Sequence, residues 1–293
     1  MTDADNADMQ VAFVTWSGGP EVSADDRLAV VACADQGIHV EAATWDVDRD
    51  WRRYDAIVIR STWNYHLYPA QFTDWIDRCA AAGCSIWNPA AVLRWNLDKR
   101  YLLQLAAAGL LVPDTIVVAK GSTVELRDVL RSRGWTDAVV KPVVSASAFQ
   151  TFRAGDAGGD GDESARAFAE AVASRDMLVQ QFVPEILAGE VSVMFFGGQF
   201  SHAVKKIPAD REFRVQEEFG GQVEPYAPDA GTLRTCDIAL SHVPGPTLYA
   251  RIDGVSTARG FEVIEVEVIE PSLFFRHDPA AATRFANALC RIP

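Results

Sequence analysis

The chain has 293 residues, 49% hydrophobic and 23% charged, and is long enough to form two or three lobes with sizeable cores. No window approaches the ~20 apolar residues that a membrane span requires. With 27 Lys and Arg against 40 Asp and Glu, the net charge of −13 opposes binding to nucleic acid. These numbers exclude a membrane-spanning helix and disfavour a nucleic-acid partner, whereas an anionic small molecule could still bind at a local cluster of cations.

The N-terminal segment MTDADNADMQ is acidic and polar and lacks the basic and apolar regions of a signal peptide, so we expect a cytoplasmic protein. The five cysteines are odd in number and have no CxxC spacing. We expect reduced thiols rather than disulfides or a zinc site. A homo-oligomer is compatible with this composition, which does not decide the oligomeric state.

Short apolar runs alternate with helix-like stretches over the first ninety residues. Strands are predicted at VAFVTW, IHVEAATW, YDAIVIRS and CSIWNP, and helices over 24–36 and 69–82. Strands that alternate with helices are typical of parallel βαβ units. We therefore expect residues 1–90 to form an N-terminal α/β lobe.

A second lobe is predicted over residues 91–181. Residues 90–110 have helical periodicity, which Gly109 and Pro113 end before the strand DTIVVA. A helix capped by Ser122 or Thr123 runs to about 133, and the strand DAVVKP follows. The run RAGDAGGDGD at 153–162 is predicted to be a mobile loop and lacks the ligand spacing of an EF-hand. A helix at 163–174 and the strand MLVQQFV complete this lobe.

From residue 190 the pattern becomes mainly β, and residues 182–293 are predicted to form the C-terminal lobe. Its strands are EVSVMFFGG, QFSHAVKK, TLYARIDGV and FEVIEVEVI, and a helix at about 279–291 closes the chain.

The last of these strands carries glutamates within an apolar sequence. Alternation predicts one face with Val263, Glu265, Glu267 and Ile269, and another with Ile264, Val266 and Val268. Glu262 and Glu270 are then solvated ends. Glu265 and Glu267 project together with Cα atoms ~6.5 to 7 Å apart, so a partly dry site would need a cation between them, and Mg²⁺ or Mn²⁺ suits such oxygens. A solvated strand with polar residues facing outward is the alternative interpretation.

Neighbouring charges favour a site for metal and phosphate. Arg251 and Asp253 share one face of the preceding strand. Lys141 ends the apolar strand DAVVKP, where a lone ammonium group is costly unless an anion meets it, and Lys99 opens a helix. Either lysine alone could be a surface residue. Together with the acidic strands they suggest a triphosphate neutralised by Lys and Mg²⁺, although neither GxxxxGK[ST] nor GxGxxG occurs.

The order of these features resembles the ATP-grasp superfamily, particularly its glutathione-synthetase-like and ribosomal-modification-like branches, over about residues 88–278. NLDKRYLLQLAAAGLLVPDT is similar to the family's first lysine helix and the strand after it, and AVVKP to its second lysine strand. The resemblance implies the ATP-grasp fold, an α/β protein in which an N-terminal parallel lobe precedes two lobes that clasp ATP. It also implies that Lys99 and Lys141 hold the ATP phosphates.

Two further segments resemble parts of the nucleotide site. VQQFVPEILAGE is similar to the hinge between the clasping lobes, which implies adenine contacts from Gln180, Gln181, Phe182 and Val183. Glu190 would then bind the ribose hydroxyls. The family's glycine-rich loop is here VVSASAF, in which Ser145 and Ser147 would meet the γ-phosphate less flexibly.

The remaining motifs concern catalysis and metal. HAVKKIPADREFRVQEEFGG resembles the segment that faces the γ-phosphate and the acyl phosphate, and it implies catalytic roles for Lys206 and Arg214, with Arg251 as a third candidate. RIDGV and EVEVIEPS resemble the metal motif. They imply that Mg²⁺ or Mn²⁺ binds to Asp253, Glu265 and Glu267. Glu267 and Gln216 each stand where the family usually has Asn.

In the N-terminal lobe, IRSTWNYH follows a strand at the edge where open α/β sheets bind ligands. The candidate substrate contacts are Arg60, Ser61, Thr62, Trp63 and Asn64. Trp63 and Tyr65 could instead pack on the next helix. RSTWNYH and WNPAAVLRWNLDKRYLL resemble the ATP-grasp subgroup that includes the cyclo-ligase making D-cycloserine from O-ureido-D-serine.

The resemblance implies an ATP-dependent carboxylate–amine ligase that acts through an acyl phosphate on an amino-acid-like small molecule. Cyclisation of O-ureido-D-serine is the specific expectation. The alternatives are an intermolecular ligase that forms a dipeptide, an ATP-binding sensor without turnover, and a kinase that stops at a phosphorylated product.

Overall fold

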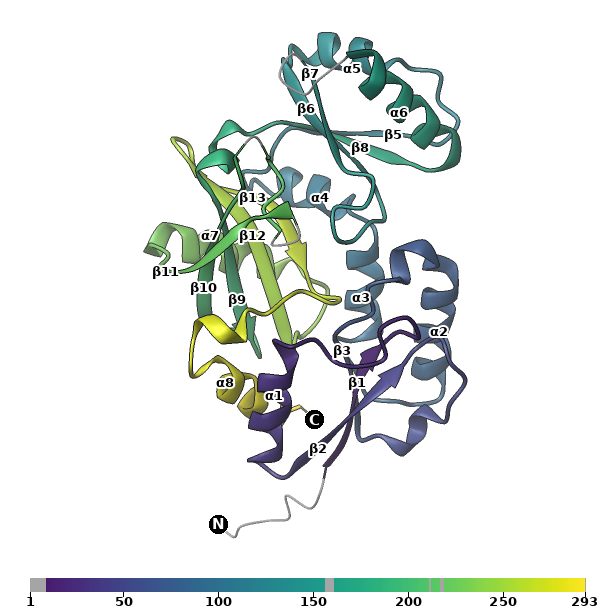
Figure 1. Ribbon diagram of the computed structural model, residues 1–293, viewed down its shortest axis with the longest axis vertical. Helices are drawn as coiled ribbons and strands as arrows, with labels where there is room; N and C mark the ends of the chain where they lie inside the picture. The colour runs from purple at the N-terminus through teal and green to yellow at the C-terminus, as the bar shows by residue number, and fades with distance from the viewer. Residues whose placement is uncertain (1–8, 156–160, 211, 217–218, 293) are drawn as a thin grey trace.

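The computed structural model describes residues 9–155, 161–210, 212–216 and 219–292. Three β-sheets follow one another along the long axis of the molecule, with the N-terminal sheet at one end (Figure 1). No helix among the described residues is long and apolar enough to cross a membrane. All five cysteines are free, as the sequence predicts.

The first sheet is parallel, as predicted for βαβ units. Its order is β2-β1-β3-β4, built from β1 (Met9–Thr15), β2 (Ile38–Thr44), β3 (Ala56–Ile59) and β4 (Ile86–Trp87). The helices α1 (Asp26–Ala34) and α2 (Pro69–Ala81) connect these strands. Side chains of α2 such as Phe72 and Trp75 pack with Ile57 and Ile59 of β3, which explains the apolar run of that strand.

The second sheet is antiparallel and has the order β5-β8-β6-β7, with β5 (Thr115–Val118), β6 (Asp137–Pro142), β7 (Phe152–Gly155) and β8 (Met177–Gln181). The helices α5 (Leu126–Arg133) and α6 (Gly161–Ser174) pack through Val129 and Phe168 onto Val140. The helix predicted from 122 therefore begins at Leu126. Of the predicted loop at 153–162, residues 153–155 belong to β7, 156–160 lie outside the described residues, and 161–162 begin α6.

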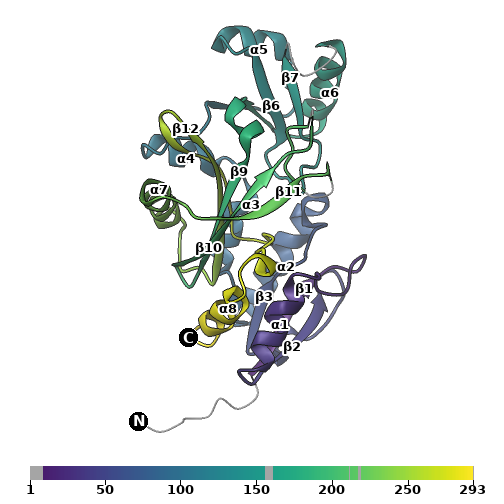
Figure 2. The same ribbon diagram turned by 60° about the vertical axis from the view of Figure 1, so that its left-hand side comes forward.

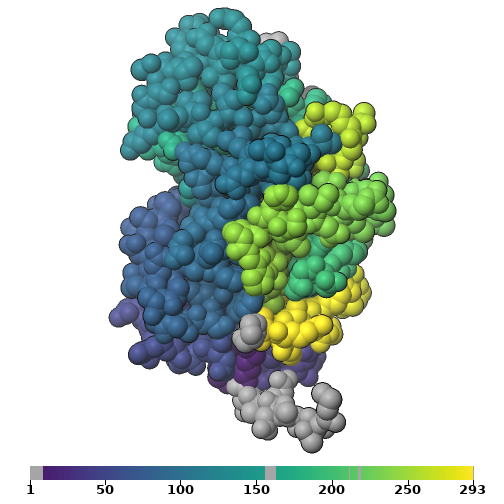
Figure 3. All heavy atoms as spheres, turned by 180° about the vertical axis from the view of Figure 1, so that it is seen from behind, coloured from purple at the N-terminus to yellow at the C-terminus, as the bar shows by residue number. Residues whose placement is uncertain are grey.

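The third sheet is also antiparallel, with the order β11-β10-β9-β12-β13. Its strands are β9 (Glu190–Phe196), β10 (Gln199–Ile207), β11 (Gln222–Tyr226), β12 (Tyr249–Thr257) and β13 (Gly260–Glu267). The helix α7 (Ala230–Ser241) covers one face through Cys236 and Ala239, and it lies on the surface seen from behind (Figure 3). The sequence did not predict β11 or α7.

The closing helix, α8 (Ala281–Leu289), links the first and third sheets. Phe285 of α8 contacts Phe13 of β1, Phe196 of β9 and Tyr249 of β12 with ring centroids 5.5 to 6.3 Å apart. The helices α1 and α8 lie side by side in both ribbon views (Figure 2). One continuous core therefore joins the two ends of the chain.

The stretch of helical periodicity over 90–110 forms two helices, α3 (Ala90–Leu97) and α4 (Tyr101–Ala107), and the second begins two residues after Lys99. The break lies at Asp98, whose backbone is extended at φ −105° and ψ 109°. Lys99 follows, and its backbone N–H donates to the Val143 carbonyl at 2.9 Å rather than continuing α3. A contact with the residue that follows β6 thus overrides the local periodicity.

Side chains from α3 and α4 bind the outer edge of β13, where the described residues form no further strand. The Tyr101 hydroxyl donates to the Val266 carbonyl at 2.8 Å and accepts from the Val266 N–H at 3.0 Å. Asn96 donates to the Val266 carbonyl at 2.7 Å and accepts from the Val268 N–H at 3.0 Å. These bonds replace the ladder that a further strand would supply and fix the position of β13.

A β-bulge between β12 and β13 changes which residues share a face. Asp253 pairs with Glu265 and Gly254 pairs with Val263, so Ile264 is the extra residue. Val263 therefore joins Val266 in the core, and the predicted faces of Val263 and Ile264 were exchanged. A Cβ on Gly254 would lie 2.5 Å from the Glu262 carbonyl oxygen, so the bulge requires glycine here.

The prediction of a solvated Glu262 was also wrong. Glu262 is 1% exposed, and its carboxylate binds the Arg259 guanidinium at 2.8 Å. The bulge and this local ion pair bury a side chain that simple alternation assigns to solvent.

Replacing Tyr101 by Phe removes one hydroxyl and keeps the ring. We expect the free energy of unfolding from urea denaturation to fall by ~1–3 kcal/mol, because the Val266 N–H and carbonyl lose a buried partner. Tyr68, which is 48% exposed, is the matched control, and Tyr68→Phe should change stability by less than ~0.5 kcal/mol. Equal stability of the two variants would contradict the role given to Tyr101.

Candidate functional site

A cavity of about 410 Å³ is lined by residues of the second and third sheets, of their connections and of the loop after β3. The second sheet contributes Lys141 and Gln180, and the third contributes Lys206 and Glu265. Trp63 comes from the loop after β3. The cavity thus gathers residues that are more than two hundred positions apart in the sequence.

Most of the residues predicted for the site line this cavity. They are Lys99, Lys141, Ser145, Ser147, Gln180, Gln181, Phe182, Val183, Glu190, Lys206, Arg214, Arg251, Glu265, Glu267 and Trp63. Asp253 lies deeper, at 2% exposure, behind this lining.

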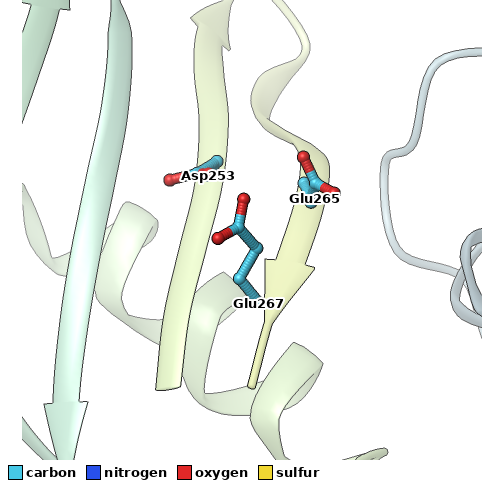
Figure 4. Close-up of side chains that lie close together, drawn as sticks. All are labelled: Asp253, Glu265 and Glu267. Carbon is cyan, nitrogen blue, oxygen red and sulfur yellow. The ribbon is translucent and has the colours of Figure 1, made fainter. Parts of the chain in front are cut away.

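Three carboxylates converge on the two strands β12 and β13 (Figure 4). One oxygen from each of Asp253, Glu265 and Glu267 lies within 4.8 Å of the other two. Asp253 and Glu265 are cross-strand partners, whereas Glu267 is placed opposite Arg251. The clustered oxygens are the donor set that Mg²⁺ and Mn²⁺ prefer, so the residues fit the predicted divalent cation.

Cations neutralise this cluster. Arg251 donates to both Asp253 oxygens at 2.9 to 3.1 Å and to Glu267 at 2.6 Å. Lys99 Nζ lies 2.5 Å from Glu265, and Lys206 Nζ lies 3.6 Å from Asp253 and also binds Glu190. Each carboxylate of the cluster therefore has a basic partner, as buried charges require.

The surroundings separate the pKa values of the acids. Burial raises the pKa of Glu267 to about 7, helped by the negative charges of Glu265 and Asp253, although Arg251 opposes the shift. Burial also acts to raise the pKa of Asp253, but Arg251 and Lys206 prevail and lower it to about 2. Asp253 is thus ionised at neutral pH, whereas Glu267 carries a proton part of the time.

Lys141 is the contrasting case. It is 7% exposed and has no ion pair among the described residues. Burial lowers its pKa, as does the nearby charge of Lys99, whereas Glu265 acts in the other direction. A buried ammonium group that lines a cavity without a carboxylate beside it is suited to an anionic ligand.

The predicted hinge connects the second and third sheets. After β8, the chain passes through a 3₁₀ helix, η3 (Pro184–Ala188), into β9. The backbone N–H groups of Gln181 and Phe182 donate to the carbonyls of Asp114 and Asp137 at 2.8 and 3.1 Å. The Phe182 ring packs against the Arg153 guanidinium at 3.7 Å. The end of this segment next to the second sheet is thus fixed by contacts with that sheet and its flanking residues.

The loop VVSASAF keeps a glycine-like backbone without glycine. Ser147, Ala148 and Gln150 have φ values of 48°, 53° and 50°, in the left-handed region that L-residues rarely adopt. Ser147 is exposed and lines the cavity, whereas the Ser145 hydroxyl is buried and donates to the Pro142 carbonyl at 3.2 Å. The loop and the residue after it thus adopt backbone angles that glycine favours, although no glycine is present.

Arg214 lies at the cavity wall and pairs with Glu212. Its Nη2 donates to Glu212 at 2.6 Å, and its guanidinium stacks on Phe219 at 3.7 Å. The hydrogen bonds from Arg214 lower the pKa of Glu212 to about 2. The arginine is therefore held in a defined orientation by a carboxylate that stays ionised.

The predicted substrate loop is mostly buried. Of the five predicted contacts, Trp63, at 43% exposure, lines the cavity, whereas Arg60, Ser61, Thr62 and Asn64 do not. Arg60 donates to Asp26 at 2.8 and 3.0 Å and to the Pro271 carbonyl at 2.9 Å. Ser61 also donates to Asp26, and Asn64 accepts from Trp45. Internal hydrogen bonds therefore occupy most of the polar atoms of Arg60, Ser61 and Asn64, whereas Thr62 Oγ1 is buried without a partner among the described residues.

Glu270 and Tyr65 line the cavity, and sequence reasoning gave neither of them a functional role. The prediction that Glu270 is a solvated end was wrong, since the residue is half-buried in the cavity wall, where burial and the charge of Glu267 raise the pKa of its carboxyl to about 8. Pro271 lies four positions after Glu267, the last residue of β13, and its carbonyl accepts from Arg60, so the segment beyond the strand lies against the N-terminal lobe.

Two family models match the chain. Residues 11–88 match the N-terminal domain of D-cycloserine synthetase DcsG, and residues 100–273 match the ATP-grasp domain of prokaryotic glutathione synthetase. The cycloserine biosynthesis protein DcsG of Streptomyces lavendulae is 31% identical over 295 residues, covering 95% of this chain and 97% of that protein. A glutathione synthetase of Synechocystis is 28% identical and covers 67% of this chain and 58% of that protein.

Solved structures agree with these matches. The crystal structure of D-cycloserine synthetase DcsG superposes with a TM-score of 0.84 at 29% identity, covering 96% of this chain and 98% of the other. The D-alanine–D-alanine ligase of Bacillus anthracis complexed with ATP has a TM-score of 0.68 at 15% identity, with 96% of each chain covered, and shows the shared fold. The chain therefore belongs to the ATP-grasp family and is an ATP-dependent ligase that forms carbon–nitrogen bonds.

Proposed function

We propose that this ligase cyclises O-ureido-D-serine to D-cycloserine. The observation that carries the proposal is the similarity to DcsG along nearly the whole chain, including the N-terminal lobe that is not part of the ATP-grasp domain match. The cavity between the sheets, with its basic and acidic groups, supports a site for ATP beside an amino-acid-like molecule.

Lys99, Lys141 and Arg214 are proposed to hold the ATP phosphates. Lys141 is the strongest candidate, because it is buried and has no carboxylate partner among the described residues. Lys99 forms an ion pair with Glu265, so the position of its ammonium group depends on the charge of the metal cluster. Positioning and charge neutralisation are the main means by which proteins accelerate phosphoryl transfer.

Asp253, Glu265 and Glu267 would hold Mg²⁺ or Mn²⁺. The bound cation would offset negative charge on the phosphates. Gln180 to Val183 and Glu190 are proposed to surround adenosine, and Ser145 and Ser147 to meet the γ-phosphate. Arg251 holds two of the three carboxylates in place, so we assign it a positioning role.

The chemistry proceeds through an acyl phosphate. The substrate carboxylate attacks the γ-phosphorus and releases ADP, and the substrate nitrogen bonded to oxygen then attacks the acyl carbon and releases phosphate. Ring closure within one molecule has the advantage of high effective molarity. D-cycloserine lacks the carbamoyl group of O-ureido-D-serine, so hydrolytic loss of that group accompanies the reaction.

We also propose that the enzyme works in the cytoplasm on small molecules, without a nucleic-acid partner, as its net charge of −13 favours. The lobe boundaries at 90/91 and 181/182 and a homo-oligomeric state stay predictions. An intermolecular ligase is the alternative that the similarity to glutathione synthetases favours, and a dipeptide product would reveal it.

Glu265→Gln removes one charge from the metal cluster with little change in shape. We expect ADP release with O-ureido-D-serine to fall by at least ~100-fold, because phosphoryl transfer loses the cation that neutralises its charge. The measurement is coupled detection of ADP together with mass detection of D-cycloserine.

The exposed Glu224 on β11 is the matched control, and Glu224→Gln should keep wild-type turnover. Full activity of Glu265→Gln would remove the metal assignment. ATP binding without ADP release across amino-acid substrates would favour a sensor, and a stable phosphate ester would favour a kinase.

The affinity for Mn²⁺ should depend on pH through Glu267. Its pKa of about 7 leaves it mainly ionised at pH 8 and mainly protonated at pH 6, and only the carboxylate binds a cation. We expect affinity to fall roughly tenfold over that interval, measured by electron paramagnetic resonance titration without nucleotide. Glu267→Gln should flatten the dependence, and a flat wild-type profile would contradict the assignment.

A further inference from the structure

Glu270 is the one carboxylate of the cavity lining without a basic partner among the described residues. Glu190 pairs with Lys206, Glu265 with Lys99, and Glu267 with Arg251. Lys99 and Arg251 are the cations whose charge acts on Glu270, and both are held by these other acids. Burial raises the pKa of this unpartnered carboxyl to about 8, and a cationic group of a ligand that enters the cavity would ionise it and pair with it.

The backbone around Glu270 is held in place on both sides. The Tyr249 hydroxyl donates to the Ile269 carbonyl at 2.8 Å, and Arg60 donates to the Pro271 carbonyl at 2.9 Å. Arg251 donates to the Ser272 carbonyl at 3.1 Å. The chain therefore leaves β13 in a fixed conformation, and the Glu270 side chain is presented to the cavity by buried polar groups rather than by a free loop.

Glu270 lines the part of the cavity next to the N-terminal lobe. It lies between the metal cluster and the N-terminal lobe, because the residue after it is bonded to Arg60 at the end of β3, and its charge acts on Tyr65 in the loop after β3. It is not a member of the carboxylate cluster, whose three oxygens belong to Asp253, Glu265 and Glu267. These contacts favour a substrate group over the metal as its partner.

We propose that Glu270 binds the α-ammonium group of the substrate and makes the enzyme selective for amino acids that carry it. This inference rests on the proposed function, in which the α-ammonium group of O-ureido-D-serine takes no part in bond formation and stays free in the product. A charged hydrogen bond to that group fixes the end of the substrate away from the phosphates and orients the carboxylate that is activated. Arg60, predicted from the sequence as a substrate contact, acts here as a positioning residue.

The test compares O-ureido-D-serine with 3-(ureidooxy)propanoate, which lacks only the α-amino group. Equilibrium binding of both compounds is measured with the wild type and Glu270→Gln, and kcat and KM follow where turnover occurs. We expect the wild type to prefer O-ureido-D-serine by roughly 100-fold and the variant to lose most of this preference, mainly through KM. The KM for ATP and the Mn²⁺ affinity should change less than about twofold, and Glu224→Gln should behave as the wild type.

A variant that keeps the wild-type preference overturns the inference, as does a wild type that binds both compounds equally or binds neither. Loss of Mn²⁺ affinity in Glu270→Gln would instead make it a metal ligand and also overturn the inference. A wild type that binds with the expected preference but makes no D-cycloserine contradicts only the proposed function. Retained ATP binding by Glu270→Gln shows that the variant is folded.

Discussion

Burial of carboxylates on β12 and β13 is the constraint on which the site depends. Asp253, Glu265 and Glu267 stand within 4.8 Å of one another, and such a group cannot stay ionised in a partly dry cavity without cations. Arg251 bridges two of the three, and Lys99 and Lys206 bring charge from α3–α4 and from β10. The need to neutralise these carboxylates thus brings several parts of the chain together at one site.

The strand β13 also joins the site to the rest of the fold. Asn96 and Tyr101 bind the outer edge of β13 through hydrogen bonds. Lys99 lies between them at the break between α3 and α4, so the segment that fixes β13 also positions this lysine. Where the strand ends, Tyr249 and Arg60 hold the turn that carries Glu270. The N-terminal lobe, the lysines and the metal ligands are therefore coupled through hydrogen bonds to one segment, and a shift of that segment would disturb both ends of the cavity.

The sequence was sufficient for features that depend on local pattern or on motif order. The parallel first sheet follows from alternating strands and helices, and the cavity gathers most of the residues that the ATP-grasp resemblance implied. Features set by distant contacts could not be read in this way. The faces of Val263 and Ile264 depend on a bulge opposite Gly254, and the break at Asp98 depends on a hydrogen bond to Val143. The sequence suggested Arg60 as a substrate contact. Its buried partner, Asp26, lies 34 residues earlier, so the local sequence does not reveal the pair.

Activation of the substrate carboxylate by ATP is the central claim, and isotope transfer tests it most directly. O-ureido-D-serine labelled with ¹⁸O in its carboxylate is converted with the wild-type enzyme, and the released phosphate is analysed by mass spectrometry. Attack of the carboxylate on the γ-phosphorus predicts one ¹⁸O atom in each phosphate, because the acyl carbon–oxygen bond breaks when nitrogen attacks. Phosphate released without label while D-cycloserine forms would contradict the acyl-phosphate account.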